Sequence, residues 1–191
     1  MDELIDILNN KGEFTGITAL KSEAHKNGWY HATVHVWFYT DKKQILLQQR
    51  ASTKKVFPSL WDVSVAGHIG VGESIIDSAI RESKEEIGIE ISKKQLIKVG
   101  ERMDKIVHPN GILDNEFKHI FICKLLKQID ELTFQKEEVD DIRLFSFDEI
   151  QQSIDNFENS NFRIVPVDFE YYKFIMRTVE KRIKKNPQNN F

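Results

Sequence analysis

Residues 67–89 read GHIGVGESIIDSAIRESKEEIGI and predict a glycine-rich loop followed by one helix. Ser74, with Asp77 three residues later, matches a capping pattern of the S-x-x-[DE] kind, so the helix is expected to begin just after Ser74. Gly88 is expected to end it, because glycine accepts the left-handed conformation found at helix C-termini. The rest of the chain is interpreted around this helix of about three to four turns, which is an ordinary length.

The helix is expected to have a packing stripe and an acidic face, since successive residues turn by about 100°. The packing stripe consists of Ile76, Ile80, Ser83 and Ile87. The acidic face consists of Glu82, Glu85 and Glu86. Like charges at this spacing destabilise a helix by about 0.2–0.5 kcal/mol per pair, so they need either open water or a bound cation. Taken by itself, the acidic face is explained by exposure to solvent. However, the preceding glycines allow the backbone to approach a ligand closely, and Glu73 adds a carboxylate beside the face. These additions favour a hard divalent cation such as Mg²⁺.

The same residues resemble the signature of the Nudix hydrolases, G-x5-E-x7-R-E-U-x-E-E-x-G-U, where U is a bulky apolar residue. The matching positions are Gly67, Glu73, Arg81, Glu82, Glu85, Glu86, Gly88 and Ile89. Ser83, at the first U position, is the single departure. Because Ser83 lies on the packing stripe, the departure is expected to weaken helix packing rather than metal binding. The signature spans 23 of the 191 residues, and its fixed spacing makes the resemblance specific.

The resemblance implies an enzyme that hydrolyses phosphate anhydrides with Mg²⁺, or alternatively Mn²⁺, as cofactor. The residues that would hold one to three ions are Glu82, Glu85 and Glu86, with the Gly67 carbonyl as a further ligand. Glu82 or a later carboxylate would orient or deprotonate the attacking water. Arg81 would form an ion pair that orients a glutamate, for example Glu73, rather than contact the substrate.

Residues outside the signature are expected to complete the site. A further metal-binding carboxylate is expected from Glu116, which opens a strongly predicted strand, and Glu137 and Glu138 are the alternatives. Arg50 is expected to bind a substrate phosphate, because guanidinium pairs bidentately with phosphate oxygens, although a structural salt bridge is an equal alternative. The other residues assigned to substrate binding are Gln48, Lys55 and His68.

The remaining sequence predicts an α/β fold. Residues 1–28 are expected to form an N-terminal β-hairpin, over 3–9 and 13–18, and a short helix over 20–26. Further strands are expected over 29–40, 44–50, 61–66, 95–103, 115–126 and 139–147, and further helices over 148–154 and 166–185. The prediction is a single Nudix hydrolase domain over 1–191, a Nudix-like α/β/α sandwich with a mixed central sheet and a C-terminal helix. Substrate specificity is expected to lie in the loops 51–60, 104–114 and 155–165.

Composition narrows the class of protein. An apolar fraction of 40% supports a proper core, and a net charge of −3 gives no basic field, so no nucleic acid partner is expected. The single cysteine, Cys123, allows no intrachain disulfide and indicates a reducing compartment. The acidic N-terminus does not resemble a signal peptide, and no stretch approaches 18 apolar residues. A cytoplasmic enzyme without a membrane partner is expected, and a homodimer through the N-terminal hairpin or the C-terminal helix remains open.

Two alternative functions also remain open. Over residues 1–150, the segments HATVHVW, LLQQR and WDVSVAGHIG resemble the Nudix branch close to isopentenyl-diphosphate isomerases, which use a histidine-rich metal site and a catalytic cysteine in S-V-C-G-H. Ala66 stands at the cysteine position and can neither donate nor accept a proton. The residues that fall near the isomerase metal ligands are His25, His31, His68, Asp114 and Glu116.

The other alternative is a non-catalytic sensor of a nucleotide-like ligand. Such sensors tend to carry an added winged-helix module and to have lost some of the acids, and neither feature is seen in the sequence. The working hypothesis is therefore a Mg²⁺-dependent pyrophosphohydrolase. Its small-molecule substrate would be a nucleoside diphosphate linked to another group, or a compound like a nucleoside triphosphate.

Overall fold

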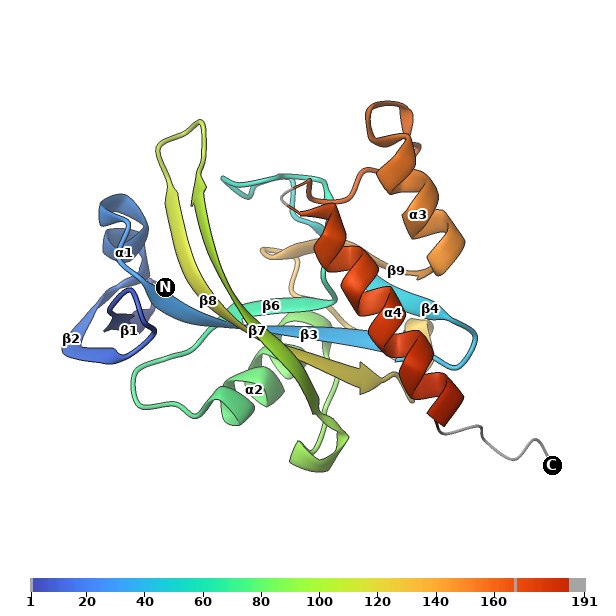
Figure 1. The fold of residues 1–191 in the computed structure, drawn as a ribbon, viewed down its shortest axis with the longest axis horizontal. Coiled ribbons are helices and arrows are strands. Elements are labelled where there is room, and N and C mark those ends of the chain that lie inside the picture. Colours follow the sequence, from blue (N-terminus) through green and yellow to red (C-terminus); the bar gives the residue numbers. More distant parts are fainter. Residues whose placement is uncertain (1, 167, 186–191) are drawn as a thin grey trace. The chain divides into compact units, whose positions relative to one another are not determined.

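A computed structural model describes residues 2–166 and 168–185 (Figure 1). The chain forms two compact units. Unit 1 comprises Met1–Val36 and Val65–Phe121, and unit 2 comprises Trp37–Ser64 and Ile122–Phe191. Strands β3 (His31–Thr40) and β8 (Leu113–Lys124) each contribute residues to both units.

Unit 1 begins with the predicted hairpin and short helix. These elements are β1 (Leu4–Leu8), β2 (Phe14–Leu20) and α1 (Lys21–Asn27). The two strands pair antiparallel, and Asn9 accepts hydrogen bonds in the turn from the backbone N–H groups of Lys11 and Glu13. Gly28 ends α1 in the left-handed conformation, with φ of 64°. A small core joins the three elements and consists of Ile5, Ile7, Ala19 and Ala24.

Helix α2 (Ile75–Ile87) has the predicted ends. The Ser74 hydroxyl accepts a hydrogen bond from the Asp77 N–H at 3.1 Å, and Gly88 closes the helix with φ of 68°. The predicted packing stripe needs correction, because the buried side is rotated toward the acids. It consists of Ser78, Ala79, Glu82, Ser83, Glu86 and Ile87, whereas Ile76 and Ile80 are only partly buried. Polar partners that satisfy the two carboxylates make this burial tolerable.

Strand β6 (Val65–His68) links the two groups of polar side chains in unit 1. It pairs antiparallel with β3 and lies beside α2 (Figure 1). Residues directly opposite in such a ladder point to the same face. The opposed pairs are Thr33 with His68, Val34 with Gly67, His35 with Ala66, and Val36 with Val65. One face therefore carries the histidines, and the other is apolar and faces α2 at Gly67.

Strands β7 (Ile97–Val107) and β8 form a long hairpin whose turn belongs to unit 1 (Figure 1). The turn is closed where the His108 N–H donates to the Ile112 carbonyl at 2.9 Å. Most of the segment 104–114, predicted as a loop, is therefore strand. The alternation of polar and apolar residues here is strand-like, and the Asn110–Gly111 pair marks only the turn itself.

Unit 2 is built around β4 (Gln44–Arg50), which pairs antiparallel with its neighbours. Those neighbours are β5 (Trp61–Asp62), β9 (Val139–Ser146) and the end of β3. The strand predicted over 61–66 is interrupted between β5 and β6, because the Ser64 hydroxyl donates to the Leu46 carbonyl and accepts from the Phe38 N–H. An isolated parallel bridge joins Trp61 and Ile164.

Two helices complete unit 2, α3 (Phe147–Asp155) and α4 (Phe169–Lys185). Ser146 and Glu149 form a capping box at α3, and the Trp37 indole N–H donates to the Tyr171 hydroxyl of α4 at 2.9 Å. The C-terminal helix predicted over 166–185 begins at Phe169, and Val167 lies outside the described residues. The α/β class with a mixed central sheet, an N-terminal hairpin and a C-terminal helix is confirmed.

No helix among the described residues is long and apolar enough to cross a membrane. Cys123 is buried, and burial raises the pKa of its thiol to about 12, so the thiol stays protonated. The cytoplasmic location stays a prediction.

Replacing Ser74 by alanine should lower the free energy of unfolding by about 1 kcal/mol, because the first turn of α2 loses its cap. Urea denaturation followed by circular dichroism measures this change. Ser74→Thr is the matched control, since a threonine hydroxyl also caps a helix and can still donate to the Asp77 carboxylate. Equal stability of Ser74→Ala and wild type would show that the cap contributes nothing.

Candidate functional site

Gly67 lies where the backbone of β6 meets the side chain of Glu82. A Cβ atom built at Gly67 would lie 2.0 Å from the Glu82 Cδ atom and 2.4 Å from its Oε1 atom. Such distances are far below van der Waals contact, so a larger residue at this position would displace the Glu82 carboxylate. The glycine thus brings the β6 backbone against a buried carboxylate, as the signature resemblance implies for a shared metal ligand set.

Arg81 gathers the signature carboxylates around its guanidinium. Its Nε and Nη2 atoms bind the two Glu73 oxygens at 2.9 Å each, which is a bidentate pair. Its Nη1 atom donates to Glu82 Oε1 at 2.8 Å and to Glu85 Oε2 at 2.9 Å. Its Nη2 atom also donates to the His68 carbonyl of β6 at 3.0 Å. The guanidinium thus pairs with three carboxylates, and the orienting role of Arg81 stays a prediction.

The three acids of α2 differ in their surroundings. Burial raises the pKa of Glu82 to about 7, although Arg81 acts to lower it. Glu86 is also buried, and its Oε2 atom accepts a hydrogen bond from the Ala66 N–H at 3.2 Å. Glu85 is about half exposed, at 51% of its side-chain surface. Two buried carboxylates beside a half-exposed one suit a hard divalent cation that keeps part of its water shell.

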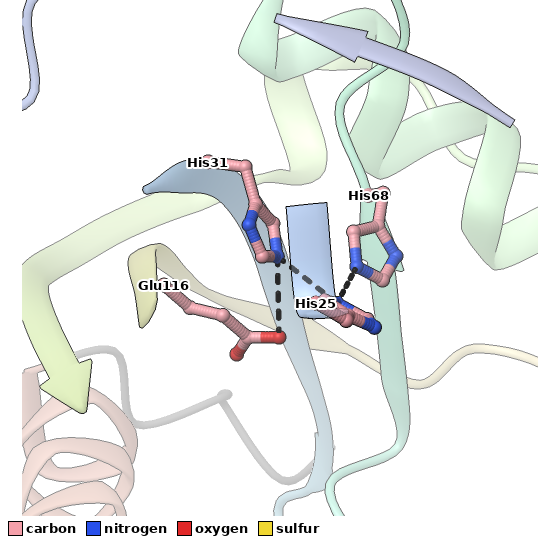
Figure 2. A group of neighbouring side chains, drawn as sticks. All are labelled: His25, His31, His68 and Glu116. Carbon is pink, nitrogen blue, oxygen red and sulfur yellow. Dashed lines mark hydrogen bonds and ion pairs between the residues drawn. The ribbon is translucent and has the colours of Figure 1, made fainter. Parts of the chain in front are cut away.

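A second group of ligand-type side chains lies on the histidine face of β3 and β6 (Figure 2). It consists of His25 from α1, His31 from β3, His68 from β6 and Glu116 from β8. One ligand atom of each residue lies within 4.8 Å of those of the others. The sequence places these residues on four separate elements, and only the isomerase resemblance indicated that they meet.

The distances within this group fit a metal ion. The Nε2 atom of His25 is 3.3 Å from that of His31 and 3.4 Å from that of His68. Around a tetrahedral zinc ion with Zn–N bonds of about 2.0–2.1 Å, ligand nitrogens lie about 3.3–3.4 Å apart. The other ring nitrogen of His31, Nδ1, is 3.0 Å from the Trp29 carbonyl, and by donating there it would leave the Nε2 lone pair directed at the group.

The protonation states also suit metal binding. Burial, followed by the charge of His31, lowers the pKa of His25 and lowers that of His68 further. Burial alone would raise the pKa of Glu116, but Lys118 and His31 hold it well below its usual value. Neutral imidazoles and an ionised carboxylate are the forms that bind metal ions.

The β7–β8 hairpin supports the histidine group with residues that the sequence reasoning mostly missed. His108 Nε2 is 2.7 Å from Asp114 Oδ2. The other oxygen of Asp114, Oδ1, is 3.8 Å from His25 Nε2 and has no hydrogen-bond partner within the described residues. Lys118 lies 2.9 Å from Asp104 and 3.3 Å from Glu116. The alternate spacing of these residues along two strands is the signal that could have predicted a shared face.

The structure brings Glu116 and His68 together with His25 and His31. Glu116 as a ligand of the signature ion and His68 as a substrate-binding residue stay predictions. Unit 2 contains the other residues assigned to the substrate, which are Gln48, Arg50 and Lys55. Arg50 donates to Asp62 Oδ2 and to the Val56 carbonyl, each at 3.0 Å, which favours the salt-bridge alternative. The alternative carboxylate Glu138 forms an ion pair with Lys54 in the same unit.

Comparison with known proteins adds sequence relatives and similar folds. The family model described as NUDIX domain matches residues 29–167. Nudix hydrolase 3 of Arabidopsis thaliana is 32% identical over 98% of the chain, which spans 24% of that protein's length. An uncharacterized Nudix hydrolase of Clostridium acetobutylicum is 35% identical over 81% of the chain and 75% of its own length.

The isopentenyl-diphosphate isomerase of Escherichia coli is also similar, with 37% identity over 62% of the chain and 65% of its own length. Among solved structures, DR0079 from Deinococcus radiodurans shares the fold with a TM-score of 0.61 and 18% identity, covering 84% of this chain and 93% of that one. The NUDIX domain of Shewanella oneidensis NrtR, complexed with ADP-ribose, has a TM-score of 0.57 and 15% identity, covering 81% and 88%.

Replacing Gly67 by alanine should lower the melting temperature by roughly 3–10 °C, because the new methyl group forces Glu82 and the β6 backbone apart. Differential scanning calorimetry of the metal-free protein measures the shift. Gly70→Ala is the matched control, since a Cβ there meets only Glu73 Oε2, at an ordinary 3.4 Å. The same melting temperature for both variants would contradict the close approach at Gly67.

Proposed function

The chain belongs to the Nudix family, and on that basis we propose that it is a Mg²⁺-dependent pyrophosphohydrolase, with Mn²⁺ as an alternative ion. The proposed substrate is a nucleoside diphosphate linked to another group, or a compound like a nucleoside triphosphate. The observation that carries the proposal is the clustering of the α2 carboxylates around Arg81, against the backbone of Gly67.

The residues of this cluster would have separate tasks. Glu82, Glu85, Glu86 and the Gly67 carbonyl would hold the ion, which when bound neutralises charge on the phosphate oxygens. Arg81 and Glu73 would keep the cluster in place, because their bidentate pair fixes the guanidinium against β6. One of the carboxylates would orient the attacking water and accept its proton.

Glu86→Gln should reduce Mg²⁺-dependent hydrolysis by about 100-fold or more, because an amide is a poorer metal ligand than a carboxylate and the ion supplies several kcal/mol of charge stabilisation. Phosphate and pyrophosphate release would be measured over nucleotide sugars, ADP-ribose, dinucleotides, nucleoside triphosphates and prenyl diphosphates.

Glu90→Gln is the control, since Glu90 lies just beyond α2 and pairs with Lys84 at the surface. Wild-type turnover by Glu86→Gln on every hydrolysed compound would refute the proposal. Tight nucleotide binding by the wild type without turnover in Mg²⁺ or Mn²⁺ would instead establish the sensor alternative.

The histidine group favours one further candidate, an isomerase-like enzyme with a transition-metal centre. His25, His31, His68 and Glu116 would hold the ion. Asp114 would add a fifth ligand through its Oδ1 atom, which has no hydrogen bond among the described residues. Imidazole and carboxylate ligands suit Zn²⁺, Mn²⁺ or Co²⁺. Ala66, at the position of the isomerase cysteine, weighs against the isomerase reaction itself but not against the metal centre.

His31→Ala should abolish one equivalent of tight Zn²⁺ binding, because it removes a fully buried ligand from the middle of the group. Metal content after gel filtration and isothermal titration measure the loss. His119→Ala is the control, as His119 pairs with Glu101 outside the group. Conversion of isopentenyl to dimethylallyl diphosphate by the wild type would establish the isomerase alternative. Equal Zn²⁺ content in the wild type, His31→Ala and His119→Ala would exclude a metal centre at the histidine group.

A single domain over 1–191 and a homodimer also remain part of the proposal. The N-terminal hairpin exposes apolar side chains that a second copy could cover, with Phe14 at 56% and Ile17 at 57% exposure. Sedimentation equilibrium of the wild type and of Ile17→Lys would show whether the hairpin carries a dimer contact.

A further inference from the structure

Thr33 is a buried residue whose hydroxyl has no partner among the described residues. Its exposure is 3%, and its Oγ1 atom is buried without a hydrogen bond. Buried hydroxyls are nearly always paired, because an unpaired one loses its bonds to water and gains none in return. The hydroxyl therefore needs a partner that the described residues do not supply.

The position of Thr33 places its side chain beside the histidine group. Thr33 lies two residues after His31 on β3, so the two side chains share a face of the strand. It also lies directly opposite His68 across the β3–β6 ladder, where facing Cβ atoms are about 4.5–5.5 Å apart. Thr33 thus adjoins two members of the group.

The metal centre proposed above does not use this hydroxyl. Three imidazoles and the carboxylate of Glu116 already provide four ligands. Asp114 Oδ1, which also lacks a hydrogen bond among the described residues, lies 3.8 Å from His25 Nε2. A threonine hydroxyl is not among the usual ligands of such an ion. A site with four protein ligands is closed unless its coordination expands, as it can in catalytic centres that take a ligand from outside the protein. The buried Thr33 hydroxyl, which lacks a partner among the described residues, is the observation that favours the expanded form.

We propose that Thr33 positions an exogenous oxygen ligand at the histidine group, which makes this group a ligand-binding centre rather than a closed structural site. The ligand is a water molecule or a phosphate oxygen of a small molecule, since the hydroxyl can donate to either. The proposal rests on the histidine metal centre, and it is independent of hydrolysis at α2.

Thr33→Val tests the proposal, because valine has nearly the same shape and lacks only the hydroxyl. The metal-free variant should melt a few degrees higher than the wild type, since an unpaired buried group is removed. Its Co²⁺ dissociation constant should rise by roughly tenfold, the low end of the effect expected for groups beside a metal centre. Co²⁺ titration followed by visible absorption, with excess Mg²⁺ present to occupy the carboxylates of α2, measures the second effect.

Two variants serve as matched controls. Thr33→Ser keeps the hydroxyl and should restore Co²⁺ affinity close to that of the wild type. Thr15→Val removes a hydroxyl of unit 1 that does have a partner, the Ile7 carbonyl at 2.8 Å, so it should lower the melting temperature and leave Co²⁺ affinity unchanged.

The choice of ligand is tested by adding inorganic pyrophosphate to the Co²⁺-loaded protein. A spectral change in the wild type that Thr33→Val weakens, with the Co²⁺ content unchanged after gel filtration, identifies a phosphate oxygen. An unchanged spectrum, together with the tenfold loss of Co²⁺ affinity in Thr33→Val, leaves water as the ligand. A lower melting temperature for metal-free Thr33→Val, or unchanged Co²⁺ affinity, would overturn the role of Thr33. Equal Co²⁺ binding by the wild type and His31→Ala would overturn the centre and this inference with it, while the Glu86→Gln assay reports on hydrolysis separately.

Discussion

The guanidinium of Arg81 is the interaction on which the acidic site depends. Three carboxylates and one backbone carbonyl converge on it, from the glycine loop, from α2 and from β6. Without this cation, Glu73, Glu82 and Glu85 would repel one another in a partly buried setting. Hydrogen bonding to Glu73, followed by the charge of Glu82, raises the pKa of Arg81 further, so the positive charge is permanent. Arg81 therefore holds these carboxylates together through contacts within the protein.

Local sequence predicted α2 well because both of its ends are set by near neighbours. Ser74 bonds three residues ahead, and Gly88 bonds back to the last turn, so their chemistry can be recognised in the sequence alone. The packing stripe was right at Ser83 and Ile87 but missed two buried acids. Glu82 and Glu86 are buried because they contact Arg81 and the backbone of Ala66. Hydrophobic periodicity cannot anticipate a carboxylate that is buried by its partners.

The histidine group, in contrast, could not be predicted from local sequence. Its members come from four elements and follow no spacing rule, so only resemblance to a related branch connected them in the sequence. The interruption at Ser64 was missed for a similar reason, since its hydroxyl bonds to backbone groups far along the chain. What the residues alone could not predict in these cases was long-range hydrogen bonding and the meeting of distant strands.

The pairing of β6 with β3 has a consequence for folding fidelity. Gly67 and His68 are consecutive, yet one contacts Glu82 and the other belongs to the histidine group, because neighbouring strand residues point to opposite faces. A slip of β6 by one residue would turn the imidazole toward α2 and place a glycine among the histidines. The close approach of Gly67 to Glu82 and the histidine group would be lost in the same error, so a molecule that retains either one has paired this short strand in the correct register.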